Sequence, residues 1–176
     1  MTEIARRAGV GIATLFRRFP TREALIAEAF AAKMTAYADA IEAAQADPDP
    51  WHGFQRFIER LAEMQAADRG FTRALTMTCP TADLFEAERQ RAFQAFSELT
   101  ERAKRTGRLR ADFVPQDLGL LLLANAAVVN AVGDVAPDAW RRMIDYLLQS
   151  FESVNTSPLA PPLEEGVLRS AMMRRR

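Results

Sequence analysis

The chain has 176 residues, of which 49% are hydrophobic and 26% are charged, and this balance excludes a disordered or fibrous protein. A single cysteine, Cys79, cannot form a disulfide within the chain, and a single histidine, His52, excludes most histidine-based metal sites, so we expect no metal and no cofactor. The longest apolar run, 118–132, is too short to cross a bilayer, and the start of the chain does not resemble a signal peptide. We therefore expect a cytoplasmic protein that does not enter a membrane.

The formal net charge is zero, but the charges are unevenly distributed. Residues 1–22 contain five arginines against Glu3 alone, a net charge of +4. Residues 23–157 contain 14 basic and 20 acidic residues, a net charge of −6, and residues 158–176 have a net charge of +2. A basic head on an acidic body favours contact between the head and a polyanion, although the arginines are also compatible with ordinary solvated helix faces.

The first elements are predicted to be helices separated by clear breaks. An apolar stripe beginning at Ile4 ends at Gly9, which suits a left-handed helix cap. A second short helix is expected from about Gly11 to Phe19, and Pro20 ends it. Thr21 then caps a long helix that we expect over 21–46.

Helical spacing continues through the rest of the chain. It predicts helices over 51–68, from 84 to just before Thr106–Gly107, over 116–132 and over 137–153, with a shorter apolar segment at 71–77. No strand pattern of useful length is present. The prediction is an all-α protein with an N-terminal helix-turn-helix followed by a helical bundle.

The two short helices meet the steric requirements of a helix-turn-helix. Ala5 is small enough to let a second helix cross closely above it, and Gly9 tolerates positive φ at the turn. Leu15 is placed to point back into the hinge. The outward positions of the second helix are polar or basic: Thr14, Arg17 and Arg18.

The residues between these landmarks match a known pattern. The segments 4–10 (IARRAGV), 13–20 (ATLFRRFP) and 22–25 (REAL) resemble the DNA-binding segment of the tetracycline-repressor (TetR/AcrR) family. That family has roughly I-A-x-x-A-G-V-S-x-x-T-L-Y-x-H-F followed by a polar residue, K and E. The match is dense over residues 4–25, and beyond it the order and lengths of the helices are also similar.

The resemblance implies a set of DNA-binding residues. Arg18 replaces a phosphate-contacting histidine and Arg22 replaces a lysine at the start of the long helix, where the helix dipole also favours phosphate. Phe16 replaces a tyrosine and lacks its hydroxyl, while Gly11 replaces a capping serine. Arg17 is able to read guanine. The residues expected to contact DNA are Ile12, Ala13, Thr14, Phe16, Arg17, Arg18 and Arg22.

One departure from the family pattern lies at the start of the sequence. The family has a further helix before the one that contains Ile4, whereas here Met1 stands at the beginning of that helix. Either the natural start lies upstream or the head lacks its first helix. In both cases we expect Ile4, Ala8 and Phe19 to be partly exposed and DNA binding by these 176 residues to be weak.

The resemblance also implies a ligand-binding and dimerisation body. We place the DNA-binding domain at 1–33, the body at 34–154 and a flexible tail at 155–176. Ligand contacts are expected from the larger side chains of the middle helices, although such stripes also form ordinary cores. These candidates are Trp51, Phe54, Phe57, Ile58, Leu61, Met64, Phe71, Leu75, Cys79, Phe93 and Phe96.

The last two helices are candidates for a homodimer interface, because the body has more apolar helix surface than one small bundle needs. A purely internal core is the alternative. Asn125 and Asn130 interrupt an apolar run and need partners, which a second chain, a ligand or water would supply; we rank the second chain first. The interface candidates are Asn125, Val129, Asn130, Trp140, Ile144, Leu147, Leu148 and Phe151.

Together these features predict a regulator and not an enzyme, since the sequence offers no catalytic constellation. The expected function is repression through a palindromic double-stranded DNA operator, relieved by a small, largely apolar effector. The alternative is a ligand-binding or protein-interaction bundle that has lost DNA binding.

Overall fold

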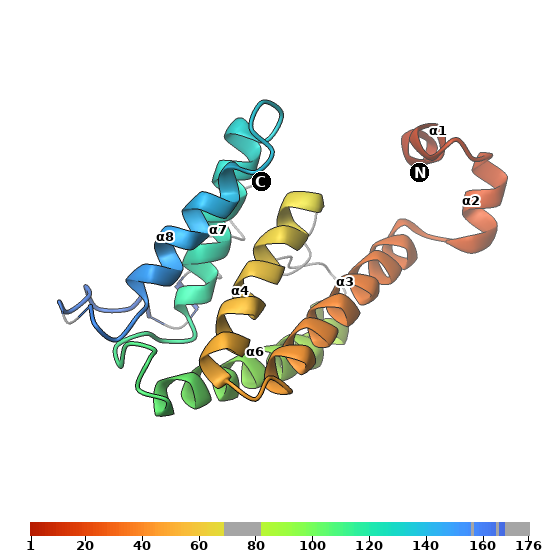
Figure 1. Cartoon of the computed structure of the whole chain (residues 1–176). Helices are drawn as coiled ribbons and strands as arrows, with labels where there is room; N and C mark the ends of the chain where they lie inside the picture. Colours follow the sequence, from red (N-terminus) through yellow and green to blue (C-terminus); the bar gives the residue numbers. More distant parts are fainter. Residues whose placement is uncertain (69–81, 156, 165, 168–176) are drawn as a thin grey trace.

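The structure is a computed structural model that describes residues 1–68, 82–155, 157–164 and 166–167; in the helix that begins at residue 82, side chains are described from residue 90. The described part of the chain forms α-helices (Figure 1). These are α1 (Thr2–Ala8), α2 (Ile12–Arg18), α3 (Arg22–Gln45), α4 (Pro50–Ala67), α6 (Ala82–Arg105), α7 (Asp117–Val132) and α8 (Ala139–Ser150). Within the described ranges, extended backbone pairs only at the isolated antiparallel bridge between Leu109 and Glu152. The all-α prediction is confirmed.

Helices α1 and α2 form a head that stands apart from the remaining helices and is joined to them through α3 (Figure 1). Gly9 follows α1 with a φ of 65°, and the amide of Val10 donates to the carbonyl of Ala5 at 3.0 Å. At the start of α3, the Thr21 hydroxyl accepts a hydrogen bond from the amide of Ala24 at 3.1 Å. The predicted glycine cap and threonine cap are therefore confirmed, and both act locally.

The other helices form the body, in which α4 is the central element. It contacts α3, α6, α7 and α8, so its apolar side chains are covered from several sides. Phe54 stacks near Phe96 with ring centroids 6.0 Å apart, and Phe113 meets Phe54 edge-on at 5.3 Å. These rings belong to one contiguous core.

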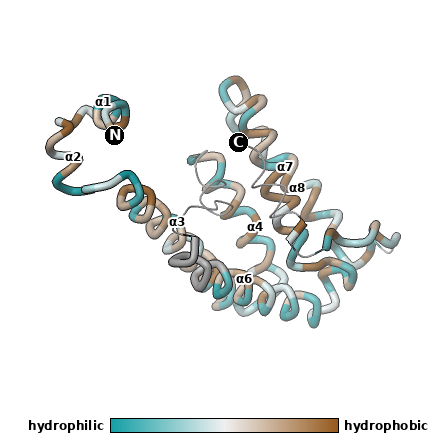
Figure 2. The backbone as a smooth tube through the Cα atoms, turned by 180° about the vertical axis from the view of Figure 1, so that it is seen from behind, coloured by the Kyte–Doolittle hydropathy of each residue, from teal (hydrophilic) through white to brown (hydrophobic). Residues whose placement is uncertain are grey.

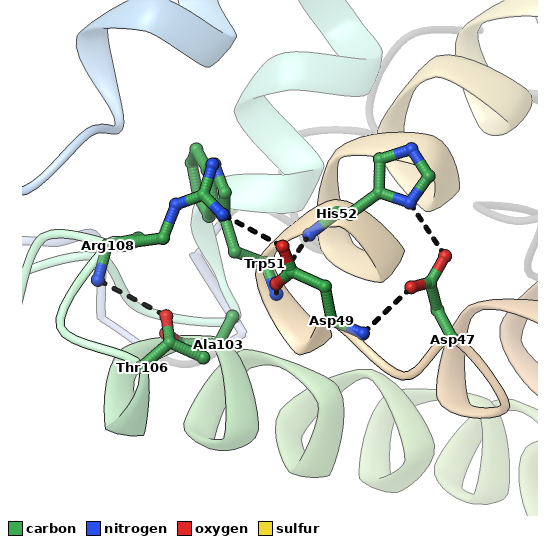
Figure 3. A network of polar contacts seen from close by, with 7 residues as sticks. All are labelled: Asp47, Asp49, Trp51, His52, Ala103, Thr106 and Arg108. Carbon is green, nitrogen blue, oxygen red and sulfur yellow. Dashed lines mark hydrogen bonds and ion pairs between the residues drawn. The ribbon is translucent and has the colours of Figure 1, made fainter.

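A polar network closes the end of the body that lies away from the head (Figure 3). Asp49 caps α4, because its Oδ1 accepts from the amide of Trp51 at 3.0 Å. Its Oδ2 pairs with the Arg108 guanidinium at 2.8 Å, and His52 Nδ1 lies 2.7 Å from Asp47 Oδ2. The network ties the turn between α3 and α4 to the loop after α6.

The described beginning of the predicted tail is attached to the body. The Arg110 guanidinium donates to the carbonyl of Ser157 at 2.7 Å, and Asp112 Oδ2 accepts from the amide of Leu159 at 3.1 Å. The rest of the predicted tail from residue 168 lies outside the described residues. Across the described ranges, no helix has the length and apolar character needed to cross a membrane.

Candidate DNA-binding head and ligand-binding body

The helix α2 presents a continuous exposed surface. All seven residues predicted to contact DNA are exposed, and they include the last-turn pair Arg17 and Arg18 as well as Arg22 at the first position of α3. Ile12 and Phe16 keep 40% and 45% of their surface exposed. The structure thus places every predicted DNA contact on the outside of the head.

Two small or medium apolar residues hold α1 and α2 together. Ala5 is 3% exposed and Leu15 is 7% exposed, and these are the buried residues of the two helices. Leu15 therefore lies against α1, as the helix-turn-helix pattern predicts, while α2 turns its polar side outward. Ile4 and Val10, by contrast, remain 39% and 41% exposed.

Ion pairs divide the arginines of the head into two groups. Glu3 accepts hydrogen bonds from Arg6 at 2.6 Å and from Arg7 at 2.8 Å, and these bonds lower the pKa of Glu3 to about 2. Arg18 pairs with Glu28 at 3.3 Å. In the described part of the chain no carboxylate pairs with Arg17 or Arg22. Arg17 and Arg22 are therefore the arginines of the head whose charge is not offset by a nearby carboxylate among the described residues, and a guanidinium of this kind favours an external anion.

Helix α3 connects the head to the body without a break. Its first buried residue is Phe30, so the turns before it carry the head while the later turns belong to the body. Near its C-terminus, the Tyr37 hydroxyl donates to the carbonyl of Ala92 at 3.3 Å, and Arg102 donates to the carbonyl of Gln45 at 2.8 Å. Burial raises the pKa of Tyr37 well above its usual range, so its hydroxyl remains a donor.

Most of the predicted ligand contacts are core residues. Because α4 is surrounded by four helices, its apolar stripe fills the centre of the body. Phe93 is 44% exposed on α6. Phe71, Leu75 and Cys79 lie outside the described residues. The candidates that are buried are Trp51, Phe54, Phe57, Ile58, Leu61, Met64 and Phe96. Ligand contact by this set stays a prediction, but the core interpretation that the sequence left open accounts for these seven side chains.

An open cavity lies elsewhere, between α3 and α6. We call it the α3–α6 groove; its volume is about 480 Å³, and none of the predicted ligand contacts that the structure describes lines it. Its apolar wall includes Phe30, Met34, Tyr37 and Ile41 of α3, and Arg91 of α6 lies along it. The sequence shows the apolar stripe of α3. It gives no local signal that α6, which lies more than fifty residues later in the chain, leaves part of this stripe exposed in a cavity.

Asn125 finds its partner inside the same chain. Its Nδ2 donates to Gln65 Oε1 at 2.8 Å and to the carbonyl of Ala62 at 3.1 Å, and Gln65 Nε2 donates to the carbonyl of Leu122 at 3.1 Å. Both side chains are fully buried. The amide nitrogen of Asn125 is therefore satisfied within the chain by contacts that join α4 to α7, whereas its buried Oδ1 accepts no hydrogen bond among the described residues. A place for Asn125 in a dimer interface stays a prediction. Gln65 continues the buried spacing of Ile58 and Leu61, and this position was the signal that the sequence analysis missed.

The remaining residues predicted for the dimer interface divide by face. Val129, Trp140, Ile144 and Leu148 are buried within one chain, Leu147 and Phe151 are half-buried, and Asn130 is exposed. The stripe of α8 turns toward α4 and α7, which is why its large side chains are already covered. What remains open is a second side of α7. The backbone trace of this helix has hydrophobic colours along most of its length (Figure 2). This α7 outer face consists of Leu120, Ala124, Ala127 and Ala131.

Within the described residues, no group of three or more histidine, cysteine or carboxylate side chains is placed to hold a metal ion.

Two short helices are joined by a glycine in the left-handed conformation, and the second helix is exposed and basic. This arrangement defines a DNA-binding helix-turn-helix protein. Residues 1–29 match the model of bacterial regulatory proteins of the tetR family, and residues 49–149 match the C-terminal domain of SbtR-like transcriptional regulators. The chain belongs to the TetR family of transcriptional regulators.

A solved structure supports the same assignment. A TetR transcriptional regulator from Streptomyces coelicolor is similar to this chain with 28% sequence identity and a TM-score of 0.57, and the similarity covers 85% of each chain. No curated protein matches the sequence.

Proposed function

We propose that this TetR-family regulator represses transcription by binding a palindromic operator as a homodimer, and that a small, largely apolar effector releases it. The observation that supports this most directly is the exposure of the whole predicted recognition surface of α2, together with Arg17 and Arg22, neither of which pairs with a carboxylate in the described part of the chain. As a DNA-binding regulator it would act in the cytoplasm, where the bacterial chromosome lies.

The exposed residues of the head have different roles in this proposal. Arg17 reads a guanine edge in the major groove, where a bidentate contact discriminates between bases. Arg18 and Arg22 contact phosphates, and Arg22 does so at the N-terminus of a helix of 24 residues, where the dipole adds to its charge. Thr14 lies one turn before Arg17, whose guanidinium donates to the Thr14 hydroxyl at 3.3 Å, and this bond restricts the arginine side chain.

A palindromic operator requires two heads at a set separation. Half-sites lie about 34 Å apart along the DNA, so the two copies need a rigid mutual contact. We assign that contact to the α7 outer face, whose residues follow helical spacing and include small alanines that allow two helices to approach closely. Asn130, also exposed, lies at the edge of this face.

The effector acts through α3 in this proposal. A ligand that shifts α3 within the body moves both heads, and the separation of the recognition helices then no longer matches the half-sites. The ligand shifts the equilibrium only as far as it prefers the non-binding arrangement, so its effect is a difference in affinity between two states.

The test is a fluorescence-anisotropy titration of the chain with labelled intergenic DNA that flanks its own gene. We expect weak but specific binding, in line with the sequence, that falls steeply as the salt concentration rises. Arg22→Ala should weaken binding to all sequences and reduce the salt slope by about 1, whereas Arg17→Ala should also relax base preference. Arg60→Ala is the matched control, because Arg60 is an exposed arginine on α4 that pairs with Glu63 far from the head.

Failure of the chain to bind any of these fragments above the level of unrelated DNA would contradict the proposal. It would favour the alternative of a helical bundle that binds ligands or proteins without DNA. The exposure of Ile4 and Val10 on the head is the observation that makes this alternative worth testing.

A further inference from the structure

The ion pair between Arg18 and Glu28 differs from the other ion pairs of the head in the elements that it joins. Glu3 pairs with Arg6 and Arg7 inside α1, at 2.6 and 2.8 Å. Arg18 Nη2 lies 3.3 Å from Glu28 Oε1, so this pair connects the last turn of α2 to α3. Among the described residues, no other ion pair links α2 to another helix.

Two contacts hold the guanidinium of Arg18 close to the turn that leads from α2 into α3. One is the carboxylate of Glu28, and the other is the ring of Phe19, whose centroid lies 5.7 Å from the guanidinium carbon. Both side chains of the ion pair are open to solvent, with 72% of Arg18 and 61% of Glu28 exposed. A phosphate outside the head therefore reaches this guanidinium without any rearrangement of the core.

A carboxylate and a phosphate compete for the same arginine. Both present oxygens to the planar guanidinium, and the contact with one limits the contact with the other. The bond of 3.3 Å is longer than the roughly 2.7–2.9 Å of strong charge-assisted bonds, and exposed ion pairs stabilise little, so a well-placed phosphate displaces Glu28 at small cost. Non-specific binding to DNA depends on charge alone, and pairing with Glu28 removes one cation from that attraction.

We propose that Glu28 is an intramolecular competitor of DNA phosphate, which keeps Arg18 from contributing to non-specific binding. The inference rests on the phosphate contact that the proposed function assigns to Arg18, and it makes that contact conditional on release from Glu28. When Arg17 and Arg22 have set the register on an operator, a phosphate is held next to Arg18 and the exchange is favourable. On other sequences the ion pair persists, so Glu28 raises the preference for the operator by weakening binding to other DNA.

Fluorescence anisotropy of the whole chain with a labelled duplex of unrelated sequence measures the non-specific attraction. At about 50 mM salt, Glu28→Gln should bind about threefold more tightly than the parent chain, and its salt slope should steepen by up to about 0.9, the value for one added phosphate contact. Glu42→Gln is the matched control, because Glu42 is an exposed carboxylate of the same helix that lies about 21 Å farther from the head. It should change neither quantity, and circular dichroism should show that both variants remain folded.

A double-mutant cycle separates competition for Arg18 from a general repulsion between Glu28 and DNA. If Glu28 acts through Arg18, then Arg18→Gln should weaken binding only slightly in the parent chain but about threefold in the Glu28→Gln chain. The gain from Glu28→Gln should accordingly disappear when Arg18 is already glutamine. A general repulsion would instead give the same gain with either residue at position 18.

The proposal is overturned if Glu28→Gln binds the unrelated duplex no more tightly than the parent chain, or if its gain persists in the Arg18→Gln chain. Weaker binding by Glu28→Gln would also overturn it, because the ion pair would then be a structural tie that places α2. On the gene-flanking DNA that the parent chain prefers, Glu28→Gln should gain less than on the unrelated duplex, and an equal gain would contradict the effect on operator preference. A chain that shows the predicted gain and its loss in the cycle, but no preference for gene-flanking DNA, contradicts the proposed function alone.

Discussion

At the scale of single residues, side-chain size is most tightly limited where the backbones of two helices approach each other. Gly53 in α4 lies against the end of α3, and a Cβ at this position would overlap the carbonyl oxygen of Ala44 and come within 3.1 Å of Asp47 Cβ. The carbonyl belongs to a helix backbone that is fixed by its own hydrogen bonds, so it cannot move aside as a flexible side chain would. Glycine is therefore required here for close packing rather than for an unusual φ.

We predict that Gly53→Ala destabilises the body. The overlap should cost up to about 3 kcal/mol, whereas the higher helix propensity of alanine offsets about 1 kcal/mol. The net loss expected in urea unfolding is therefore about 2 kcal/mol. Gly11→Ser is the control, because its Cβ would lie at an ordinary 3.8 Å from the Thr14 hydroxyl. Equal stability of Gly53→Ala and the parent chain would show that α3 and α4 can separate without cost.

At the scale of elements, the chain after α8 is attached to the loop between α6 and α7. The Arg110 side chain is 8% exposed and pairs through two nitrogens with both carboxylate oxygens of Asp112, at 2.5 and 2.9 Å. Hydrogen bonds from Arg110, and then from the amide of Leu159, lower the pKa of Asp112 to about 2. A carboxyl whose pKa is depressed by folding stabilises the folded state above its unfolded pKa, and the contribution is lost as the pH falls.

We therefore predict that Asp112→Asn lowers stability at neutral pH and that its difference from the parent chain shrinks between about pH 4 and pH 2. The measurement is thermal unfolding of both chains across this range. Asp145→Asn, which changes an exposed carboxylate on α8, should cost little at pH 7. A difference between Asp112→Asn and the parent that stays constant down to pH 2 would contradict a role for the ionised carboxylate.

The sequence predicts helices well where a local residue ends or begins them. Gly9, Pro20 and Thr21 act within one turn of the chain, and the structure places the helix boundaries at or next to them. For α7 the apolar residues extend all round, so periodicity predicts burial but cannot tell which side faces α4 and which side remains open. Leu122 is buried and Leu120 is exposed, although both belong to the same apolar run.

Sites that depend on contacts between distant segments were harder to predict. The positions of the recognition surface follow from a dense local motif, and their exposure agrees with it. The α3–α6 groove depends instead on how Phe30 and Ile41 meet Arg91, and the Asn125–Gln65 pair depends on how α7 crosses α4. The spacing of residues along one helix predicts neither the groove nor the Asn125–Gln65 pair, because both depend on how two helices pack against each other.

For the whole molecule, the proposed function requires that two copies of the chain hold their heads at a set distance. Within one chain Trp140, Ile144 and Leu148 of α8 are already buried, so we expect a second chain to contact the α7 outer face. The alanines of this face allow close helix approach, and Leu120 adds apolar area at one end. A stable interface of this kind buries at least about 1,200 Å² in total, which α7 alone would supply only together with neighbouring parts of the body.

We predict that Ala127→Glu converts the proposed dimer to a monomer, because the carboxylate would be buried without a partner at the centre of the α7 outer face. Ala127 is exposed in one chain, so the fold itself should be unchanged by circular dichroism. Sedimentation velocity at micromolar concentration should show a loss of half the mass, whereas Ala32→Glu on α3 should leave the dimer intact. The monomer should also bind a full palindrome no more tightly than one half-site, because each head would then bind independently. A dimer that survives Ala127→Glu would assign the contact between copies to another face of the body.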